Sequence, residues 1–147
     1  MTLENLLRTG QLKSYEADAK EVQRLLEAAR RNLRDSAATN ISPENRFDAA
    51  YKALMQSTLV ALMANGFVPD TKRPGHHAVA IQALPKAIGI AADRIAVLDA
   101  LRRKRNLSDY TGEDIDSRSV DECRAEAKRL LDELIAWLRQ NHPELAA

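Results

Sequence analysis

The chain has 147 residues, of which 45% are hydrophobic, 29% are charged and only 4% are aromatic. This length suits one domain with one hydrophobic core, and the scarcity of aromatic residues, glycine and proline favours helices over sheets. Lys and Arg total 22 against 21 Asp and Glu, so the molecule as a whole has no field that attracts nucleic acid or a membrane. Any such attraction has to come from a local patch.

Cysteine usage and hydropathy predict the compartment. The single Cys123 cannot form an internal disulfide, which fits a reducing compartment, and its place on an apolar helix face predicts a buried side chain. Polar and acidic residues over 1–8 do not fit a signal peptide, and no apolar run reaches the roughly 18 residues of a membrane helix. We therefore expect a cytoplasmic protein that binds no membrane, and no pattern indicates a metal site or a cofactor.

The first part of the chain predicts three helices. A short helix over 2–8 stops before Gly10, and apolar residues at helical spacing predict a long amphipathic helix over 15–36. Ser42 followed by proline is a helix-start signal, because the hydroxyl can cap free backbone N–H groups and proline lacks one. This third helix should run to Asn65 and be the central, most buried one.

The middle of the chain combines helical spacing with proline. A loop with two prolines is predicted over 67–75. Helical spacing resumes over 76–88, where Pro85 should kink or interrupt the helix. A further helix is predicted over 91–106, and the cations of its last turn, 102–105, would complement the negative end of the helix dipole.

The last part of the chain predicts a turn and one more helix. Polar residues over 109–117 predict the turn, and Ser119 with Glu122 forms a capping box that starts a final helix ending at Asn141. The predicted fold is all-α: an antiparallel up-and-down helical bundle with a short N-terminal helix and a third helical stretch interrupted by proline. It forms a single domain over 1–147, with its core over about 15–141.

The segment from Leu101 to Gly112 has the most unusual composition in the chain. Four consecutive cations, Arg102, Arg103, Lys104 and Arg105, are followed by Asn, Ser, Asp and Tyr. Arginine grips phosphate through a planar fork, tyrosine can stack on a base, and asparagine can orient either partner. These side chains suit RNA. The alternative is a solvated helical turn that only offsets the dipole.

The run Arg105-Asn106-Leu-Ser-Asp-Tyr110 resembles the signature of the HEPN superfamily, which are small helical bundles, usually dimeric. Its hallmark is an arginine, a polar residue directly after it, a few more positions, and then a histidine. The resemblance extends to 75–82 and 98–102, and the order of helices agrees over about 15–141. It implies a bundle of HEPN type that forms a homodimer through the helix bearing the motif.

The resemblance also implies a metal-independent ribonuclease site where two protomers meet. There Arg105 would hold the scissile phosphate, Asn106 would steady it, and Tyr110 stands at the histidine position. The reference pKa of tyrosine is about 10, which makes it a poor general base at neutral pH. RNA binding is therefore expected ahead of cleavage, and Tyr110 is a catalytic candidate that needs strong activation.

Further residues extend the candidate site. Arg102, Arg103 and Lys104, with Arg73 from the loop, are expected to contact nucleic acid, and Asp109 is an auxiliary candidate. His76 and His77 could supply an imidazole if Pro85 folds the chain back, whereas one continuous kinked helix would place them over about 40 Å from Arg105. Adjacent histidines face different ways on a helix, so a helix cap and a packing residue are the alternative, and a shared metal is not expected.

Two further groups of residues are candidates. Glu113, Asp114 and Asp116 form an acidic loop that could bind a divalent cation or pair with the arginines. Tyr51 and Trp137 are expected in the core or at an interface.

Three functions remain open at this point. The first is an RNA-binding or RNA-cleaving domain that resembles the toxin of a toxin and antitoxin pair. The second is a non-catalytic module that binds a nucleotidyltransferase or another protein; the HEPN resemblance implies that Tyr110 could then be the nucleotide acceptor. The third is a helical protein whose basic turn contacts nucleic-acid phosphates without discrimination.

Overall fold

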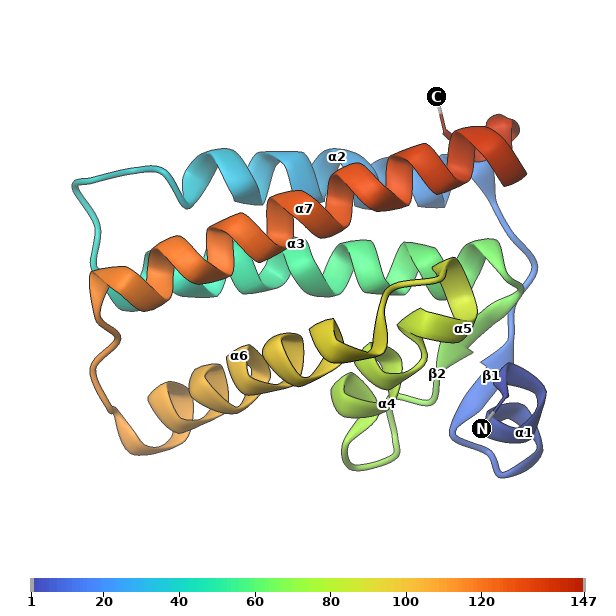
Figure 1. The fold of residues 1–147 in the computed structure, drawn as a ribbon, viewed down its shortest axis with the longest axis horizontal. Helices are drawn as coiled ribbons and strands as arrows, with labels where there is room; N and C mark the ends of the chain where they lie inside the picture. Colours follow the sequence, from blue (N-terminus) through green and yellow to red (C-terminus); the bar gives the residue numbers. More distant parts are fainter. Residues whose placement is uncertain (1, 147) are drawn as a thin grey trace.

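The computed structural model describes residues 2–146 and is mostly helical, as the sequence predicts. Long helices that follow one another along the chain run in alternating directions, with a small two-stranded sheet near the N-terminal end (Figure 1). The elements in chain order are α1 Leu3–Arg8, β1 Leu12–Ser14, α2 Ala19–Asp35, α3 Pro43–Ala64, β2 Phe67–Pro69, α4 His76–Gln82, α5 Leu84–Ile88, α6 Ala92–Thr111, α7 Ser117–Asn141 and the 3-10 helix η1 Pro143–Leu145.

Helix α3 forms the centre of the bundle. Ser42 caps it by accepting a hydrogen bond from the Asn45 backbone N–H at 3.1 Å, and Pro43 occupies its first turn. Both α2 and α7 pack along α3 (Figure 1). Its buried side chains cover more than one face, and small residues such as Ala53 let the neighbouring helices approach closely. The prediction of a central, most buried helix is confirmed.

The two strands correct the sequence-based boundaries near 15 and 67. β1 pairs with β2 in antiparallel register, with Lys13 opposite Val68, where the sequence predicted no strand. The Tyr15 backbone N–H continues this pairing by donating to the Gly66 carbonyl at 2.8 Å. Helix α2 therefore begins at residue 19, after the cap Asp18, instead of at 15. Three-residue strands are too short to give a recognisable alternation of apolar and polar residues.

The position of α6 is fixed by buried charge and by a chain reversal before it. Arg94 is buried and forms ion pairs with Glu126 and Glu133 of α7. As predicted, Pro85 interrupts the preceding helical stretch, which divides into α4 and α5. Gly89 ends α5 in the left-handed conformation at φ 74°, and the chain turns back so that α4 packs against α6.

The start of α7 differs from the predicted capping box. Asp116 caps the helix by accepting a hydrogen bond from the Ser119 backbone N–H at 2.8 Å, so the helix begins at Ser117. The Ser119 hydroxyl instead accepts a hydrogen bond from Nζ of Lys104 at 2.6 Å.

Cys123 is buried as predicted, and burial raises the pKa of its thiol to about 12. Between residues 2 and 146, no helix is long and apolar enough to cross a membrane.

Candidate functional site

The basic segment lies within a helix and not at its end. Helix α6 continues to Thr111 and ends at Gly112, which adopts the left-handed conformation at φ 71°. The predicted end near Asn106 is therefore wrong, because the polar residues after it continue the helix until glycine supplies a backbone conformation that other residues rarely adopt. The cations of 102–105 lie more than one turn before the end of the helix, so the prediction that they complement the negative end of the helix dipole is wrong.

Arg105 faces the bundle, toward α3. Its guanidinium carbon lies 5.4 Å from the centre of the Tyr51 ring, which is cation–π distance. Its Nε is 2.9 Å from Oδ2 of Asp109 and 3.6 Å from Oδ1 of Asp48, and Nη1 donates to Oδ1 of Asn106 at 3.4 Å. The predicted phosphate clamp, its polar neighbour and the auxiliary Asp109 therefore form one cluster, to which α3 contributes two residues.

The same tyrosine links Arg105 to a histidine of α4. Tyr51 is only 2% exposed, and its hydroxyl shares a hydrogen bond with Nδ1 of His77 at 3.2 Å. Burial raises the pKa of Tyr51 to about 12, although the charge of Arg105 opposes that rise, so the phenol stays protonated at neutral pH. The alternative in which the histidines lie over about 40 Å from Arg105 is excluded.

Burial lowers the pKa of His77, and the nearby charges of His76, Arg105 and Arg102 lower it further. The ring is therefore neutral at pH 7 and can accept a proton. The rings of His76 and His77 lie 4.7 Å apart, edge to face. Both line a groove of about 480 Å³ that also contains Lys13 and apolar residues of α3 and β2.

The other three of the four consecutive cations are also held by neighbouring residues. Arg102 Nε lies 2.8 Å from Oδ1 of Asp99, and Arg103 donates to Oδ2 of the same carboxylate through Nε at 2.9 Å and Nη2 at 2.7 Å. The hydrogen bond from Arg102, followed by that from Arg103, holds the pKa of Asp99 below its usual value against the opposing effect of burial. Lys104 donates from Nζ to the Ser119 hydroxyl, and the side chain of Arg103 is 71% exposed.

Tyr110 lies on a different side of α6 from Arg105. It follows Arg105 by five positions, which is a rotation of about 140° on an α-helix. Its side chain is 84% exposed. Within one chain the two residues therefore do not face a common cleft. Tyr110 instead borders a shallow hollow of about 380 Å³ with Arg103, Asn106, Leu107 and Thr111.

Two of the loop candidates, Arg73 and Asp116, have local partners. Arg73 donates from Nη2 to the Thr9 carbonyl at 2.8 Å, so its head group holds the N-terminal segment. In the acidic loop Asp116 caps α7, and the expected ion pairing of this loop with the arginines is not seen within residues 2–146. No group of three or more His, Cys, Asp or Glu side chains in that range is placed to hold a metal ion.

The sequence alone does not single out Asp48 or Asp99 as parts of the site, and it predicts Tyr51 only as a core or interface residue. Asp48 and Tyr51 are spaced three apart and share one face of α3, but nothing in that helix alone shows that Arg105 lies opposite. Asp99, at three and four positions before Arg102 and Arg103, was the one partner that spacing within a helix could have revealed.

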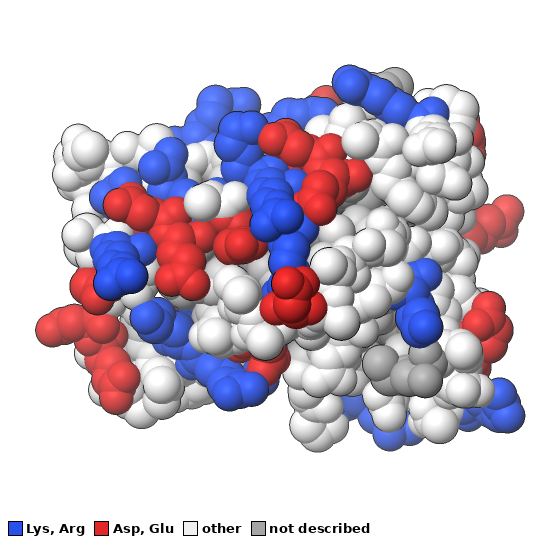
Figure 2. All heavy atoms as spheres, in the orientation of Figure 1, with Lys and Arg blue, Asp and Glu red and all other residues white. Residues whose placement is uncertain are grey.

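Comparisons with protein-family models, with curated proteins and with solved structures find no match for this chain. The function has to be inferred from the geometry of the site and from the distribution of charge. Over the face drawn in Figure 2, acidic and basic residues are interspersed, in keeping with the nearly equal totals of the two signs. On that face no broad region of one sign marks a binding surface.

Proposed function

We propose that the chain is an RNA-binding domain of HEPN type that acts as a homodimer and binds single-stranded RNA on the outer face of α6. The observation that carries this proposal is the exposure of Tyr110 and Leu107 beside Arg103 and Asn106. Among the large hydrophobic side chains in residues 2–146, those exposed are Ile41 at 41%, Leu107 at 48% and Tyr110 at 84%. Two of them lie on this one helix face.

The spacing along α6 favours this face as a nucleic-acid surface. Residues 103, 106, 107, 110 and 111 share one side of the helix because they follow the period of about 3.6. The side chains supply a guanidinium for phosphate, an amide for hydrogen bonding and a phenol ring for stacking on a base. An exposed ring stacks on any base, so we expect binding to single strands with little sequence preference.

The exposed leucine supports the homodimer. Leu107 lies in the apolar part of the hollow, between the cation and the ring. A second copy that covers Leu107 would place two such faces side by side, with Arg103 and Tyr110 of each protomer at the rim of one shared cleft. Burial of a residue of this size contributes about 1.5–3 kcal/mol when it is complete.

Binding can be tested by fluorescence anisotropy with a labelled single-stranded RNA in a buffer that contains a metal chelator. Arg103→Ala and Tyr110→Ala should each weaken binding by about tenfold, because each removes one phosphate contact or one stacked base. Tyr110→Phe should bind as the native chain does, since it keeps the ring. The matched control is Arg31→Ala, which removes an exposed arginine of α2.

Equal loss of binding in Arg103→Ala and Arg31→Ala would contradict the proposal and indicate unspecific attraction between opposite charges. Full binding by Tyr110→Ala would exclude stacking. Weaker binding at higher salt is expected in every case, because cations that meet phosphates release counterions. The comparison at one salt concentration is therefore the decisive one.

A second candidate function, cleavage of RNA at a site apart from the outer face of α6, is favoured by the link between Arg105 and His77 through Tyr51. When Nδ1 of His77 carries the proton and donates to the Tyr51 oxygen, Nε2 is free to take the proton of a ribose 2′-hydroxyl. The 2′-oxygen would attack phosphorus, the bond to the 5′-oxygen would break, and that oxygen would take a proton from water. The products would be a 2′,3′-cyclic phosphate and a 5′-hydroxyl.

The same RNA mixtures, analysed for their product ends after incubation, test cleavage. Arg105→Lys and His77→Gln should lose it, whereas Tyr110→Phe should keep it, because the base in this scheme is the histidine. Cleavage by the native chain that survives in His77→Gln would remove His77 from the reaction. Binding without cleavage in the native chain would leave the first function standing and exclude the second.

A further inference from the structure

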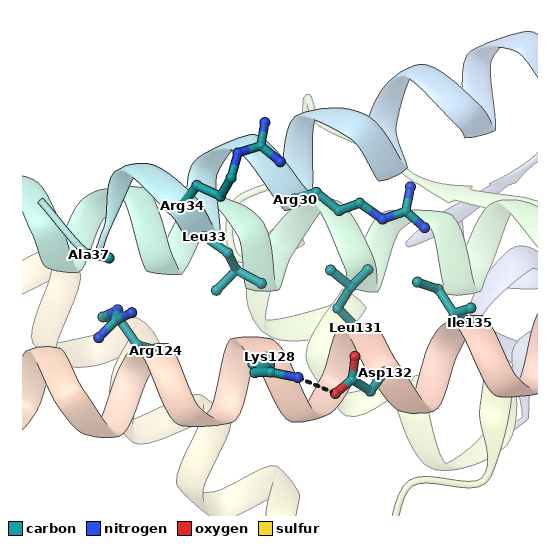
Figure 3. Close-up of a pocket in the computed structure, with 9 residues that line it drawn as sticks. All are labelled: Arg30, Leu33, Arg34, Ala37, Arg124, Lys128, Leu131, Asp132 and Ile135. Carbon is teal, nitrogen blue, oxygen red and sulfur yellow. Dashed lines mark hydrogen bonds and ion pairs between the residues drawn. The ribbon is translucent and has the colours of Figure 1, made fainter.

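A second surface, formed by α2 and α7, is independent of the α6 face. Both helices pack along α3 (Figure 1) and contact each other much less. A groove of about 480 Å³ lies between them (Figure 3). Figure 1 shows α6 on the opposite side of α7 from α2. Neither the HEPN resemblance nor the proposed RNA surface involves this groove.

Cations border the groove on both sides. Arg30 and Arg34 come from α2, and Arg124 and Lys128 come from α7, with each pair spaced four residues apart (Figure 3). Lys128 is paired with Asp132 at 2.7 Å, the one acidic residue of the lining. Elsewhere in residues 2–146, no carboxylate forms an ion pair with any of the three arginines.

The floor of the groove is aliphatic. Leu33 and Leu131 lie between the two helices in Figure 3, with Ile135 farther along α7. Leu33 and Ile135 are partly exposed, although they pack against the core. An apolar strip between two rows of cations matches a helix that carries an apolar stripe flanked by acidic residues, because side chains four apart lie on one helix face.

We infer that the groove between α2 and α7 is a docking site for an acidic amphipathic helix of a partner protein. The aliphatic floor favours a protein over a nucleic acid. Bases bind single-strand surfaces by stacking on aromatic rings, and the lining of this groove contains none. Phosphates, in turn, need the cations but gain nothing from Leu33 and Ile135.

The probe for this inference is a labelled synthetic helical peptide with leucines on one stripe and glutamates on both sides of it. Fluorescence anisotropy at low salt should detect its binding to the native chain. Arg30→Glu combined with Arg34→Glu should weaken binding by about tenfold, because two attractive pairs become repulsive. The matched control combines Arg24→Glu with Arg31→Glu, which changes the same charge on the same helix outside the groove.

Two further arms separate charge from shape. A peptide with lysine in place of glutamate should bind the Arg30→Glu, Arg34→Glu variant better than it binds the native chain. A scrambled peptide of the original composition should bind the native chain weakly, since it has no continuous apolar stripe. Lys128→Glu, on the opposite side of the groove, should also weaken binding of the acidic peptide.

Four results would overturn the inference: no binding of the acidic peptide, equal binding of its scrambled form, equal loss in the two double variants, or preferential binding of polyuridylate through Arg30 and Arg34. The last result would assign the groove to nucleic acid. None of these outcomes depends on the α6 face, so the RNA-binding proposal and this one fail separately.

Discussion

At the residue scale, Tyr51 connects groups that the sequence places far apart. Its ring supports the Arg105 guanidinium, and its hydroxyl bonds His77. The sequence identified the arginine and the histidine as candidates, but their meeting point lies on a third helix. Spacing within one helix can show which residues share a face, but only packing between helices decides which faces meet.

The lowered pKa of His77 has a consequence for stability. In the unfolded chain this histidine binds a proton near its ordinary pKa of 6.5, whereas burial in the fold keeps it neutral to lower pH. Acid therefore favours the unfolded state through this residue, and the free energy of unfolding should fall as the pH drops below about 6.5. Above that pH the ring is neutral in both states and contributes no pH dependence.

His77→Gln should make this acid-side decline shallower, because glutamine does not titrate and can still bond the Tyr51 hydroxyl. The measurement is urea unfolding followed by the fluorescence of Trp137, for both proteins, from pH 8 to pH 5. Their difference at pH 8 gives the baseline cost of the substitution. Stability curves that run parallel over the whole range would show that His77 does not titrate differently in the two states.

At the element scale, the helix starts and ends show what local chemistry can predict. Ser42 with its following proline marks the start of α3 correctly. Gly112 ends α6, several residues later than the end predicted near residue 106. The capping box at Ser119 is a genuine pattern, but Asp116 forms the cap three residues earlier. Two capping signals close together cannot be ranked from sequence, because the sequence does not show that Lys104 of α6 donates a hydrogen bond to the Ser119 hydroxyl.

The cap of α7 can be tested with a pair of neighbouring aspartates. Asp116→Ala removes the side chain that accepts from the Ser119 backbone N–H and should lower the melting temperature by a few degrees. Asp114→Ala, in the same acidic loop, should leave it unchanged. Thermal unfolding by circular dichroism measures both. An equal effect of the two substitutions would show that the charge of the loop matters and not the cap.

Hydrogen bonds donated by Ser119 hold the pKa of Asp116 below its usual value, so the cap stabilises the fold above about pH 4 and is lost as the pH falls further. The melting difference between Asp116→Ala and the native chain should therefore narrow in acid. A difference that stays constant down to pH 3 would contradict a carboxylate cap.

At the scale of the whole molecule, composition predicted the helical fold and the lack of an overall charge bias. It could not predict where the surface departs from that average. The groove between α2 and α7 draws its cations from residues nearly a hundred positions apart, such as Arg30 and Lys128. Such surfaces appear only once the helices are placed, because each helix alone has an ordinary pattern of charges.

The proposed homodimer is a property of the whole molecule and turns on Leu107. Leu107→Asp places a charge at the centre of the proposed interface in both protomers, which should raise the dimer dissociation constant by at least about tenfold. The side chain is exposed, so the melting temperature measured at low protein concentration, where the native chain is monomeric, should stay within about 2 °C of the native value.

Sedimentation equilibrium measures the association. The control is Ile41→Asp, which changes another exposed large aliphatic residue, in the loop between α2 and α3. A native chain that stays monomeric at every concentration, or an equal effect of Ile41→Asp, would contradict a dimer built on α6, and the proposed RNA-binding face would then have to act within one chain.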